Sequence, residues 1–595
     1  MRMEGYAPIG AYAAIGDGRT VALVAADGAI DWLALPTISS PTVFAALLDP
    51  ARGGRFTLEP AVRARTTRCY VPGTNVLQTE FEAERGRVRV TDWLSTQDGG
   101  LLPWFELCRR VEGVTGSVPM RWRVEPRFQY GGRAGTVRER NGVPVFSDVR
   151  LQLAVLAFDA GEPQLSDDGV GGSFDVEEGS DSLLTLIGAD NEPIPIPPRE
   201  EIHIRLEGTA GAWRRWVSGM NYEGPWRDAV ARSALVLRLL VYAPTGAIAA
   251  AATTSLPERI GGPRNFDYRF AWVRDTSFSL DAFDHLGFRE QLHQSLSWLL
   301  ATSARTHPRL EVFYGIDGSV PSQQSQLHLR GYRGSTPVHL GNGAGGQLQL
   351  GAYGDFFESV WQYVCNGNML DSVTGTRLAE VADALAGIWR NADSGIWELR
   401  GQERLYTTSK IGCWVAFDRA ARLAERGEIP ADGAGRWRAE AQAVADFVEE
   451  RCWWPQRGAY RMAADMEALD ASVLLAARMG YGDPGGERMN GTIDAVAEEL
   501  DAGWPLLYRY TGMAGEEGAF VACSFWLVEA LALAGRHDEA VRRMEAMVET
   551  TNDVGLLSEE IDPDSRELLG NFPQGLSHLA LVNAAAILET TRSDT

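Results

Sequence analysis

The sequence predicts a multidomain protein in which an N-terminal antiparallel β-sandwich is followed by an all-α domain. Two periodicities lead to this prediction: apolar and polar residues alternate in the first third of the chain, whereas a helical period dominates from Trp226 onward. The length of 595 residues also exceeds the roughly 250–300 residues that one hydrophobic core normally spans. We therefore expect a β domain over residues 1–210, a linker over 211–228 and a helical domain over 229–595.

Short alternating runs mark the expected strands of the β domain. Residues 87–90, 120–124 and 202–206 each alternate apolar with polar side chains, which is the pattern of a strand with one buried face. The dipeptide Asp27-Gly28 separates two further apolar runs and is a good signal for a hairpin turn. Many short strands interrupted by glycine and proline favour a sandwich.

The expected helices are of two kinds. Residues 519–533 and 576–588 are apolar on all sides, so other elements must surround them. Residues 538–548 carry one apolar stripe and are expected to cover such a buried layer. About a dozen helices of these alternating kinds fit an (α/α)6 barrel. A solenoid is the structural alternative, but the chain shows no fixed repeat length.

The charge balance restricts the partners of the protein. A formal net charge of −23 repels both a phosphate backbone and an anionic membrane surface, so we expect a small neutral substrate, no nucleic acid and no membrane. Neither a long uncharged apolar run nor a signal-peptide pattern is visible, and the six cysteines are scattered. These features predict a cytoplasmic protein without a disulfide framework. Because no histidine and cysteine cluster has zinc spacing, we expect no metal and no cofactor.

The basic residues show one anomaly. Of 56 lysines and arginines, Lys410 is the single lysine. A coding bias toward arginine explains this composition, but Lys410 is also compatible with a position that needs a compact charge.

Four long connections between the expected helices are rich in glycine, aromatic and polar residues: 260–275, 331–355, 391–408 and 555–570. Long connections inside a compact domain are usually functional, and alternate loops of a helical barrel gather at one end. We therefore expect these four segments to form the wall of the site. A formal GxGxxG match within the second segment lacks the surrounding βαβ unit, so a flexible loop is favoured over a nucleotide site.

Two acidic motifs are candidates for catalysis. In Trp397-Glu398 a carboxyl lies beside an indole, and an acid in an apolar pocket can donate a proton near neutral pH. Glu559 belongs to an acidic run that could either hold a general base or lie in solvent. Residues 264–275 mix arginines, aspartates and aromatics, as sugar sites do; ion pairs and core aromatics are the alternative interpretation.

Together these segments resemble glycoside hydrolase family 15, the glucoamylase-like family. The resemblance covers nearly the whole chain, and the number and order of its motifs make it specific. The motifs include Pro8-Ile9-Gly10-Ala11-Tyr12, Trp272-Val273-Arg274-Asp275, Gly395-Ile396-Trp397-Glu398, Ser409-Lys410 and Gly570-Asn571-Phe572-Pro573-Gln574. The resemblance implies a β domain of the super-sandwich kind, an (α/α)6 barrel, and inverting hydrolysis of an α-glucosidic bond without a cofactor.

The resemblance also implies the roles of individual residues. Glu398 corresponds to the general acid and Glu559 to the general base, with Glu560 as the neighbour that could be confused with it. The residues expected to bind the sugar are Tyr268, Trp272, Arg274, Asp275, Trp397 and Arg509. Lys410 is expected either to stiffen the mouth of the pocket or to meet a substrate hydroxyl.

The expected reaction is exo-acting release of β-glucose from short malto- or isomalto-oligosaccharides. Leu399 stands where fungal relatives often carry a second acid, which puts a preference for starch in doubt. Hydrolysis of trehalose, transglucosylation and sugar binding without turnover are the alternatives. A flat face of the β-sandwich is compatible with a homodimer.

Overall fold

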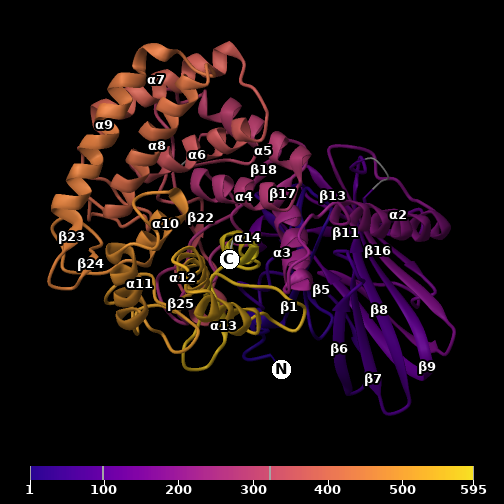
Figure 1. Cartoon of the computed structure of the whole chain (residues 1–595). Coiled ribbons are helices and arrows are strands. Elements are labelled where there is room, and N and C mark those ends of the chain that lie inside the picture. The colour runs from indigo at the N-terminus through magenta and orange to yellow at the C-terminus, as the bar shows by residue number, and fades with distance from the viewer. Residues whose placement is uncertain (1, 97–99, 321–322, 594–595) are drawn as a thin grey trace.

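The computed structural model describes residues 2–96, 100–320 and 323–593 and shows a β domain beside a helical domain (Figure 1). The strands of the β domain are β1 (Tyr12–Gly16), β2 (Val21–Ala25), β3 (Ile30–Ala34), β4 (Thr42–Phe44), β5 (Arg55–Pro60), β6 (Ala64–Tyr70), β7 (Leu77–Ala83), β8 (Gly86–Leu94), β9 (Phe105–Glu125), β10 (Arg133–Ala134), β11 (Thr136–Arg140), β12 (Val143–Ser147), β13 (Leu151–Phe158), β14 (Gln164–Ser166), β15 (Gly169–Glu177) and β16 (Asp181–Asp190). The helices are α1 (Phe128–Gly131), α2 (Arg199–Val217), α3 (Arg227–Leu240), α4 (Val273–His285), α5 (Arg289–Ser303), α6 (Gly351–Cys365), α7 (Ser372–Ile388), α8 (Thr407–Glu425), α9 (Ala434–Phe447), α10 (Leu475–Met479), α11 (Glu487–Glu499), α12 (Val521–Leu533), α13 (His537–Val548) and α14 (Gly575–Ser593). Short strands in the connections of the helical domain are β17 (Val241–Tyr242), β18 (Ala247–Ile248), β19 (Ala271–Trp272), β20 (Phe313–Tyr314), β21 (Ser325–Leu327), β22 (Val338–Leu340), β23 (Trp453–Trp454), β24 (Ala459–Tyr460), β25 (Ala519–Phe520), β26 (Glu560–Ile561) and β27 (Leu568–Leu569).

The β domain consists of two antiparallel leaves that share the long strand β9. The first half of β9 pairs with β8 and β16, and its second half pairs with β5 and β15. The expected strands at residues 87–90 and 120–124 lie in β8 and β9, and the hairpin at Asp27-Gly28 joins β2 to β3. The predicted large antiparallel β domain is therefore confirmed.

The strand expected at residues 202–206 is wrong, because this segment lies in α2. Ile202, Ala210 and Trp213 are buried, and their spacing follows the helical period. Pro198 precedes the first turn, where a proline is tolerated because no intrahelical donor is lost. The last turns of α2 also run through residues 211–217, which belong to the predicted linker.

Helices α3 to α14 form a double ring. The inner helices α4, α6, α8, α10, α12 and α14 contact one another in a closed circle, and α3, α5, α7, α9, α11 and α13 pack outside them. Every residue of α12 from Val521 to Ala532 is buried, whereas α13 buries one stripe that includes Met544 and Met547. The all-round apolar and amphipathic patterns thus correspond to inner and outer helices, and the predicted (α/α)6 barrel is confirmed.

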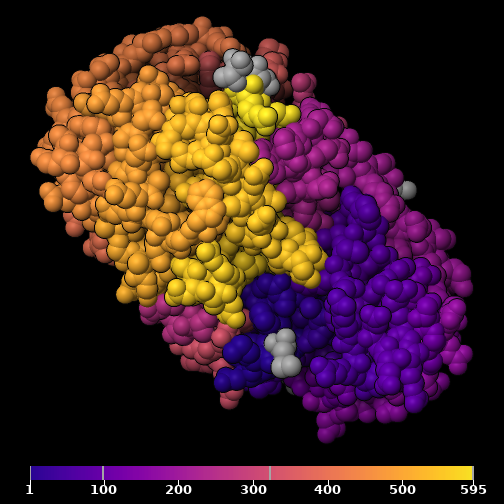
Figure 2. Space-filling model, turned by 60° about the horizontal axis from the view of Figure 1, so that its bottom comes forward, coloured from indigo at the N-terminus to yellow at the C-terminus, as the bar shows by residue number. Residues whose placement is uncertain are grey.

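The β domain packs against loops that lead into the inner helices. The Trp32 indole donates to the carbonyl of Ala252 at 2.9 Å, and Arg269 donates to the carbonyl of Ser40 at 3.0 Å. Figure 2 shows that N-terminal residues, in indigo, lie beside segments near the C-terminus, in yellow. The two hydrogen bonds support the loop before α4 from the side of the β domain. Within the described ranges, no helix has the length and apolar character needed to cross a membrane.

Candidate active site

A pocket of about 320 Å³ opens where the inner helices of the barrel begin. Its walls are the connections that lead into α4, α6, α8, α12 and α14, and all four segments expected to form the site contribute to it. The lining residues are Glu258, Pro263, Arg264, Phe266, Tyr268, Arg274, Asp275, His339, Asn342, Ala344, Ile396, Trp397, Glu398, Leu399, Arg400, Gln402, Arg509, Tyr510, Phe520, Glu559, Gln574 and Leu576. A volume of this size lies at the lower end of the range for small-molecule sites, roughly 300–1,000 Å³.

Glu398 lies on the loop between α7 and α8 and reaches the pocket in a strained conformation. Its φ of +59° falls in the left-handed region, which costs a residue other than glycine on the order of 1 kcal/mol. The Trp272 indole donates to Glu398 Oε1 at 2.6 Å. Burial raises the pKa of Glu398, and the positive charge of Arg274 offsets part of this rise. The carboxyl is thus held in one place in an environment that favours its protonated form.

Arg274 and Asp275 form an ion pair at the start of α4, on the floor of the pocket. Arg274 Nε donates to Asp275 Oδ1 at 2.8 Å, and its Nη1 donates to the carbonyl of Ile396 at 2.9 Å. The guanidinium therefore connects α4 to the loop that carries Glu398. Two planar polar groups in the lining of a pocket suit adjacent hydroxyls of a sugar ring.

Glu559 approaches the pocket from the loop before α14. The backbone N–H of Asn571 donates to Glu559 Oε2 at 3.2 Å, and a contact with the Tyr268 hydroxyl also favours the ionised carboxyl. Burial nevertheless raises the pKa of Glu559 to about 8, and the nearby charge of Glu258 adds to the rise. A side chain at Gly570 would place its Cβ only 2.5 Å from Glu559 Cβ, so glycine is needed beside this carboxyl.

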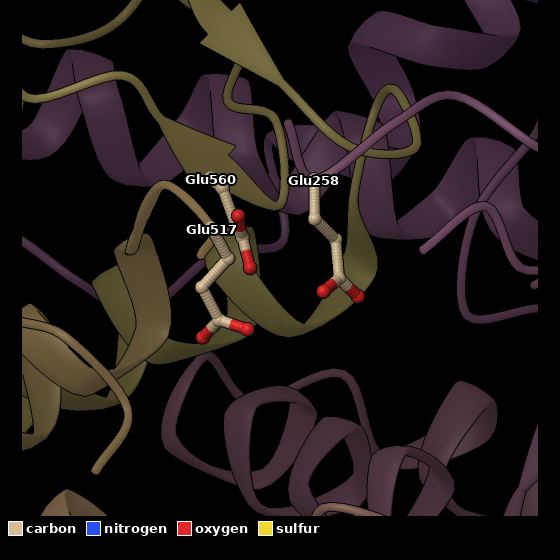
Figure 3. Close-up of side chains that lie close together, drawn as sticks. All are labelled: Glu258, Glu517 and Glu560. Atoms are coloured by element: carbon tan, nitrogen blue, oxygen red, sulfur yellow. The ribbon is translucent and has the colours of Figure 1, made fainter. Parts of the chain in front are cut away.

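The neighbouring Glu560 points to a different environment. The backbone N–H of Gly518 donates to Glu560 Oε2 at 2.9 Å, and Glu560 is fully buried. Carboxyl oxygens of Glu258, Glu517 and Glu560 lie within 4.8 Å of one another, and Figure 3 shows the three side chains converging from separate segments. Glu559 lines the pocket, whereas Glu560 belongs to this buried carboxyl cluster.

Arg509 neutralises much of the buried carboxyl cluster. Its Nε donates to Glu517 Oε1 at 2.6 Å and its Nη2 donates to Glu258 Oε2 at 2.8 Å, while Arg264 also pairs with Glu517. Three carboxylates could in principle hold a cation. Here two guanidinium groups already supply the positive charge, so ion pairing accounts for the cluster.

Most of the predicted site residues come together at the pocket. Those that line it are Glu398, Glu559, Tyr268, Arg274, Asp275, Trp397 and Arg509. Trp272 lies behind Glu398, stacked on Phe313 with ring centroids 4.6 Å apart. Lys410 does not line the pocket, and its expected contact with a substrate hydroxyl is wrong, because its ammonium is buried against the carbonyls of Trp389 and Asn391.

Two acidic residues near the pocket were not identified from the sequence. Glu258 lines the pocket with one oxygen that has no described hydrogen-bond partner, and Glu517 pairs with Arg509 and Arg264. Glu517 lies in the segment Gly515-Glu516-Glu517-Gly518, whose two consecutive acids between glycines are a signal that could have identified it. No comparable pattern surrounds Glu258, whose position follows from the fold alone.

Comparison with known proteins places this arrangement in a family. The sequence profile of glycosyl hydrolases family 15 matches residues 224–586, and a profile described as trehalase-like, N-terminal matches residues 3–149. Trehalase of Thermoplasma volcanium is 32% identical over 99% of this chain and 94% of its own length. Trehalase of Mycobacterium tuberculosis is 34% identical over 97% of this chain and 89% of its own length.

A solved structure supports the same fold. The crystal structure of a bacterial glucoamylase complexed with acarbose superposes with a TM-score of 0.74 at 14% identity, covering 98% of this chain and 95% of that one. The resemblance inferred from the sequence motifs is therefore confirmed by the family profile and by full-length relatives. The chain belongs to glycosyl hydrolase family 15 and is a glycosidase.

Proposed function

We propose that this enzyme hydrolyses α,α-trehalose with inversion at the attacked anomeric carbon. The observation that carries the proposal is the similarity, along nearly the whole chain, to relatives named trehalase, including the N-terminal domain. This proposal changes the order of substrates suggested by the motifs alone, where malto- and isomalto-oligosaccharides came first and trehalose was an alternative.

The pocket supports a short, neutral, hydroxyl-rich substrate. Its volume of about 320 Å³ suits a compact ligand better than a long glucan, although an exo-acting enzyme would need to hold only a chain end. The aromatic side chains of Trp397 and Phe520 line the pocket, and the Arg509 guanidinium lies over both rings. Aromatic faces stack on sugar rings, and planar polar groups bind pairs of hydroxyls.

In the proposed mechanism Glu398 is the general acid. Its raised pKa keeps a proton on the carboxyl, which passes to the glycosidic oxygen as the bond from this oxygen to the anomeric carbon breaks. The indole of Trp272 holds Oε1, which leaves Oε2 as the oxygen that carries the proton.

Glu559 is the proposed general base. The reaction requires the ionised form of this carboxyl, which becomes populated as the pH approaches its pKa of about 8. The ionised carboxyl takes a proton from a water molecule, whose oxygen bonds to the anomeric carbon from the opposite face of the ring. Tyr268 and the backbone N–H of Asn571 contact this carboxyl and stabilise its ionised form. The attacked ring is released as β-glucose and the other ring leaves as α-glucose. One proton has then moved from Glu398 to the leaving glucose and one from water to Glu559.

A panel of disaccharides tests the substrate. Purified enzyme is assayed with trehalose, maltose and isomaltose, together with maltotriose and starch, by measuring the glucose released. We expect kcat/KM for trehalose to exceed that for each of the other sugars by at least about 100-fold, the discrimination that a few buried hydrogen bonds supply. A preference for maltose or isomaltose would overturn the substrate assignment and leave the family assignment intact.

We also propose that the enzyme works in a reducing compartment such as the cytoplasm. All six cysteines are free, and four of them are buried. Disulfides are common in proteins of oxidising compartments, so a chain of this size without one fits a reducing environment.

A further inference from the structure

The single lysine of the chain occupies an unusual position for a charged side chain. Lys410 lies in the first turns of α8 and has no exposed surface. Its ammonium donates to the carbonyl of Trp389 and, at 2.7 Å, to the carbonyl of Asn391. Both partners are backbone carbonyls of residues just after α7, so Lys410 connects the start of α8 to the segment that follows α7.

The loop between these two helices carries Glu398. We call residues 391–406 the acid loop. Lys410 connects the beginning of this loop to α8, the helix that follows the loop. A second contact lies next to the one made by Lys410. Ser409 Oγ donates to Asp393 Oδ2 at 2.7 Å, and Asp393 and Arg404 exchange backbone hydrogen bonds of 2.9 and 3.0 Å across the loop. The acid loop is therefore closed at its base by adjacent residues of α8.

The choice of lysine at this position follows from its shape. An ammonium is a compact donor on a flexible stem, whereas a guanidinium is a planar fork with five N–H groups. Two backbone carbonyls satisfy most of the needs of an ammonium, but they would leave several guanidinium donors buried without acceptors. A chain that otherwise uses arginine for its basic side chains has lysine here, where arginine fits poorly.

The contacts at the base of the acid loop are important because the backbone of Glu398 is strained. A residue other than glycine keeps a positive φ only where the surrounding structure imposes it. The far side of the acid loop is held by Arg274, which donates to the carbonyl of Ile396, and by Gln347, which donates to the carbonyl of Glu398 at 3.3 Å. Hydrogen bonds from Lys410 fix the base of the loop in the same way.

We propose that Lys410 is a positioning residue that fixes the acid loop so that the Glu398 carboxyl meets the glycosidic oxygen. The proposal rests on the proposed function of Glu398 as general acid. It predicts a defect in proton donation rather than in sugar binding, because the ammonium lies outside the pocket and donates to backbone carbonyls at and just before the start of the loop.

The test compares two substrates that differ in their need for a general acid. The glycosidic oxygen of trehalose must be protonated as it leaves, whereas the fluoride of α-glucosyl fluoride leaves without a proton. We expect Lys410→Met to reduce kcat for trehalose by about 30- to 100-fold, the effect of displacing a catalytic group by about 1 Å. The KM for trehalose and the kcat for α-glucosyl fluoride should each stay within about threefold of the unmodified enzyme.

Three further variants make the result interpretable. Arg19→Met is the control, because Arg19 donates to the carbonyls of Leu102 and Trp104 and pairs with Asp17 in the β domain, away from the pocket, and it should leave both rates unchanged. Glu398→Gln should lose trehalose hydrolysis and keep α-glucosyl fluoride hydrolysis. If Lys410→Met does not fold, Lys410→Arg keeps the charge but not the compact shape of the ammonium, and it should show the same difference between substrates.

The possible outcomes test the positioning role of Lys410 and the general-acid role of Glu398 separately. Equal losses on both substrates, or no loss on trehalose, would overturn the positioning role of Lys410. Retention of trehalose hydrolysis by Glu398→Gln would instead overturn the general-acid assignment itself. A selective loss on trehalose in both Lys410→Met and Glu398→Gln supports both proposals.

Discussion

Replacing Glu398 with glutamine should reduce kcat for trehalose by about 10³-fold, within the range of 10²–10⁴ for loss of a general acid. Glutamine has nearly the same shape and its amide oxygen can still accept the hydrogen bond from Trp272. It has no acidic proton to give to the departing oxygen, so the bond must break with an unprotonated leaving group. Binding should survive, and calorimetric titration should give an affinity for trehalose within about threefold of the unmodified enzyme.

An exposed carboxyl on the same loop provides the control for this variant. Glu403 lies in the acid loop, is exposed to solvent and does not line the pocket. Glu403→Gln removes an equal charge from the same segment and should leave kcat unchanged. If Glu398→Gln kept more than about a tenth of the activity, a group other than Glu398 would have to donate the proton.

Replacing Glu559 with alanine should reduce kcat at least as much as Glu398→Gln does, by about 10³-fold or more. The reason is that the attacking water loses the group that removes its proton. The variant also leaves a space where the carboxyl lay. Azide is a small anion that needs no base, so adding it should restore bond cleavage and form β-glucosyl azide. The product is identified by NMR, and its β configuration would show that attack comes from the side of the missing carboxyl.

Glu560 separates the two possible assignments of the base. Its carboxyl lies in the buried cluster with Glu258 and Glu517, near Arg509. Glu560→Gln is expected to reduce kcat by less than about tenfold, since it alters only a neighbour of Arg509, which lines the pocket. Full activity in Glu559→Ala together with inactivity in Glu560→Gln would show that the base has been assigned to the wrong residue.

Both domains could be predicted from the sequence because burial imposes a period on each element. Residues 87–90 alternate in a strand with one buried face, and residues 519–533 are apolar on every side because α12 lies inside the barrel. The incorrect prediction of a strand at residues 202–206 also follows from the pattern of buried residues. A helix brings residues 202 and 206 to one face, and Ile204 between them is 71% exposed. Five residues are too few to separate the two periods.

The candidate site could be predicted only where its residues adjoin one another in the sequence. Glu398 follows a tryptophan, and Arg274 and Asp275 are consecutive, so motifs identified them. Glu258 reaches the same pocket from a segment without a distinctive pattern, because a fold and not a motif brings it there. The partners of Lys410 are backbone carbonyls, which exist at every position and leave no trace in the sequence.

The anomers formed in the first moments of trehalose hydrolysis test the central claim most directly. Proton NMR during early turnover distinguishes α-glucose from β-glucose before the two interconvert. Inverting hydrolysis by Glu398 and Glu559 predicts equal amounts, with β-glucose from the attacked ring and α-glucose from the leaving ring. Formation of α-glucose alone would mean retention of configuration, and would contradict the assignment of these two carboxyls as acid and base.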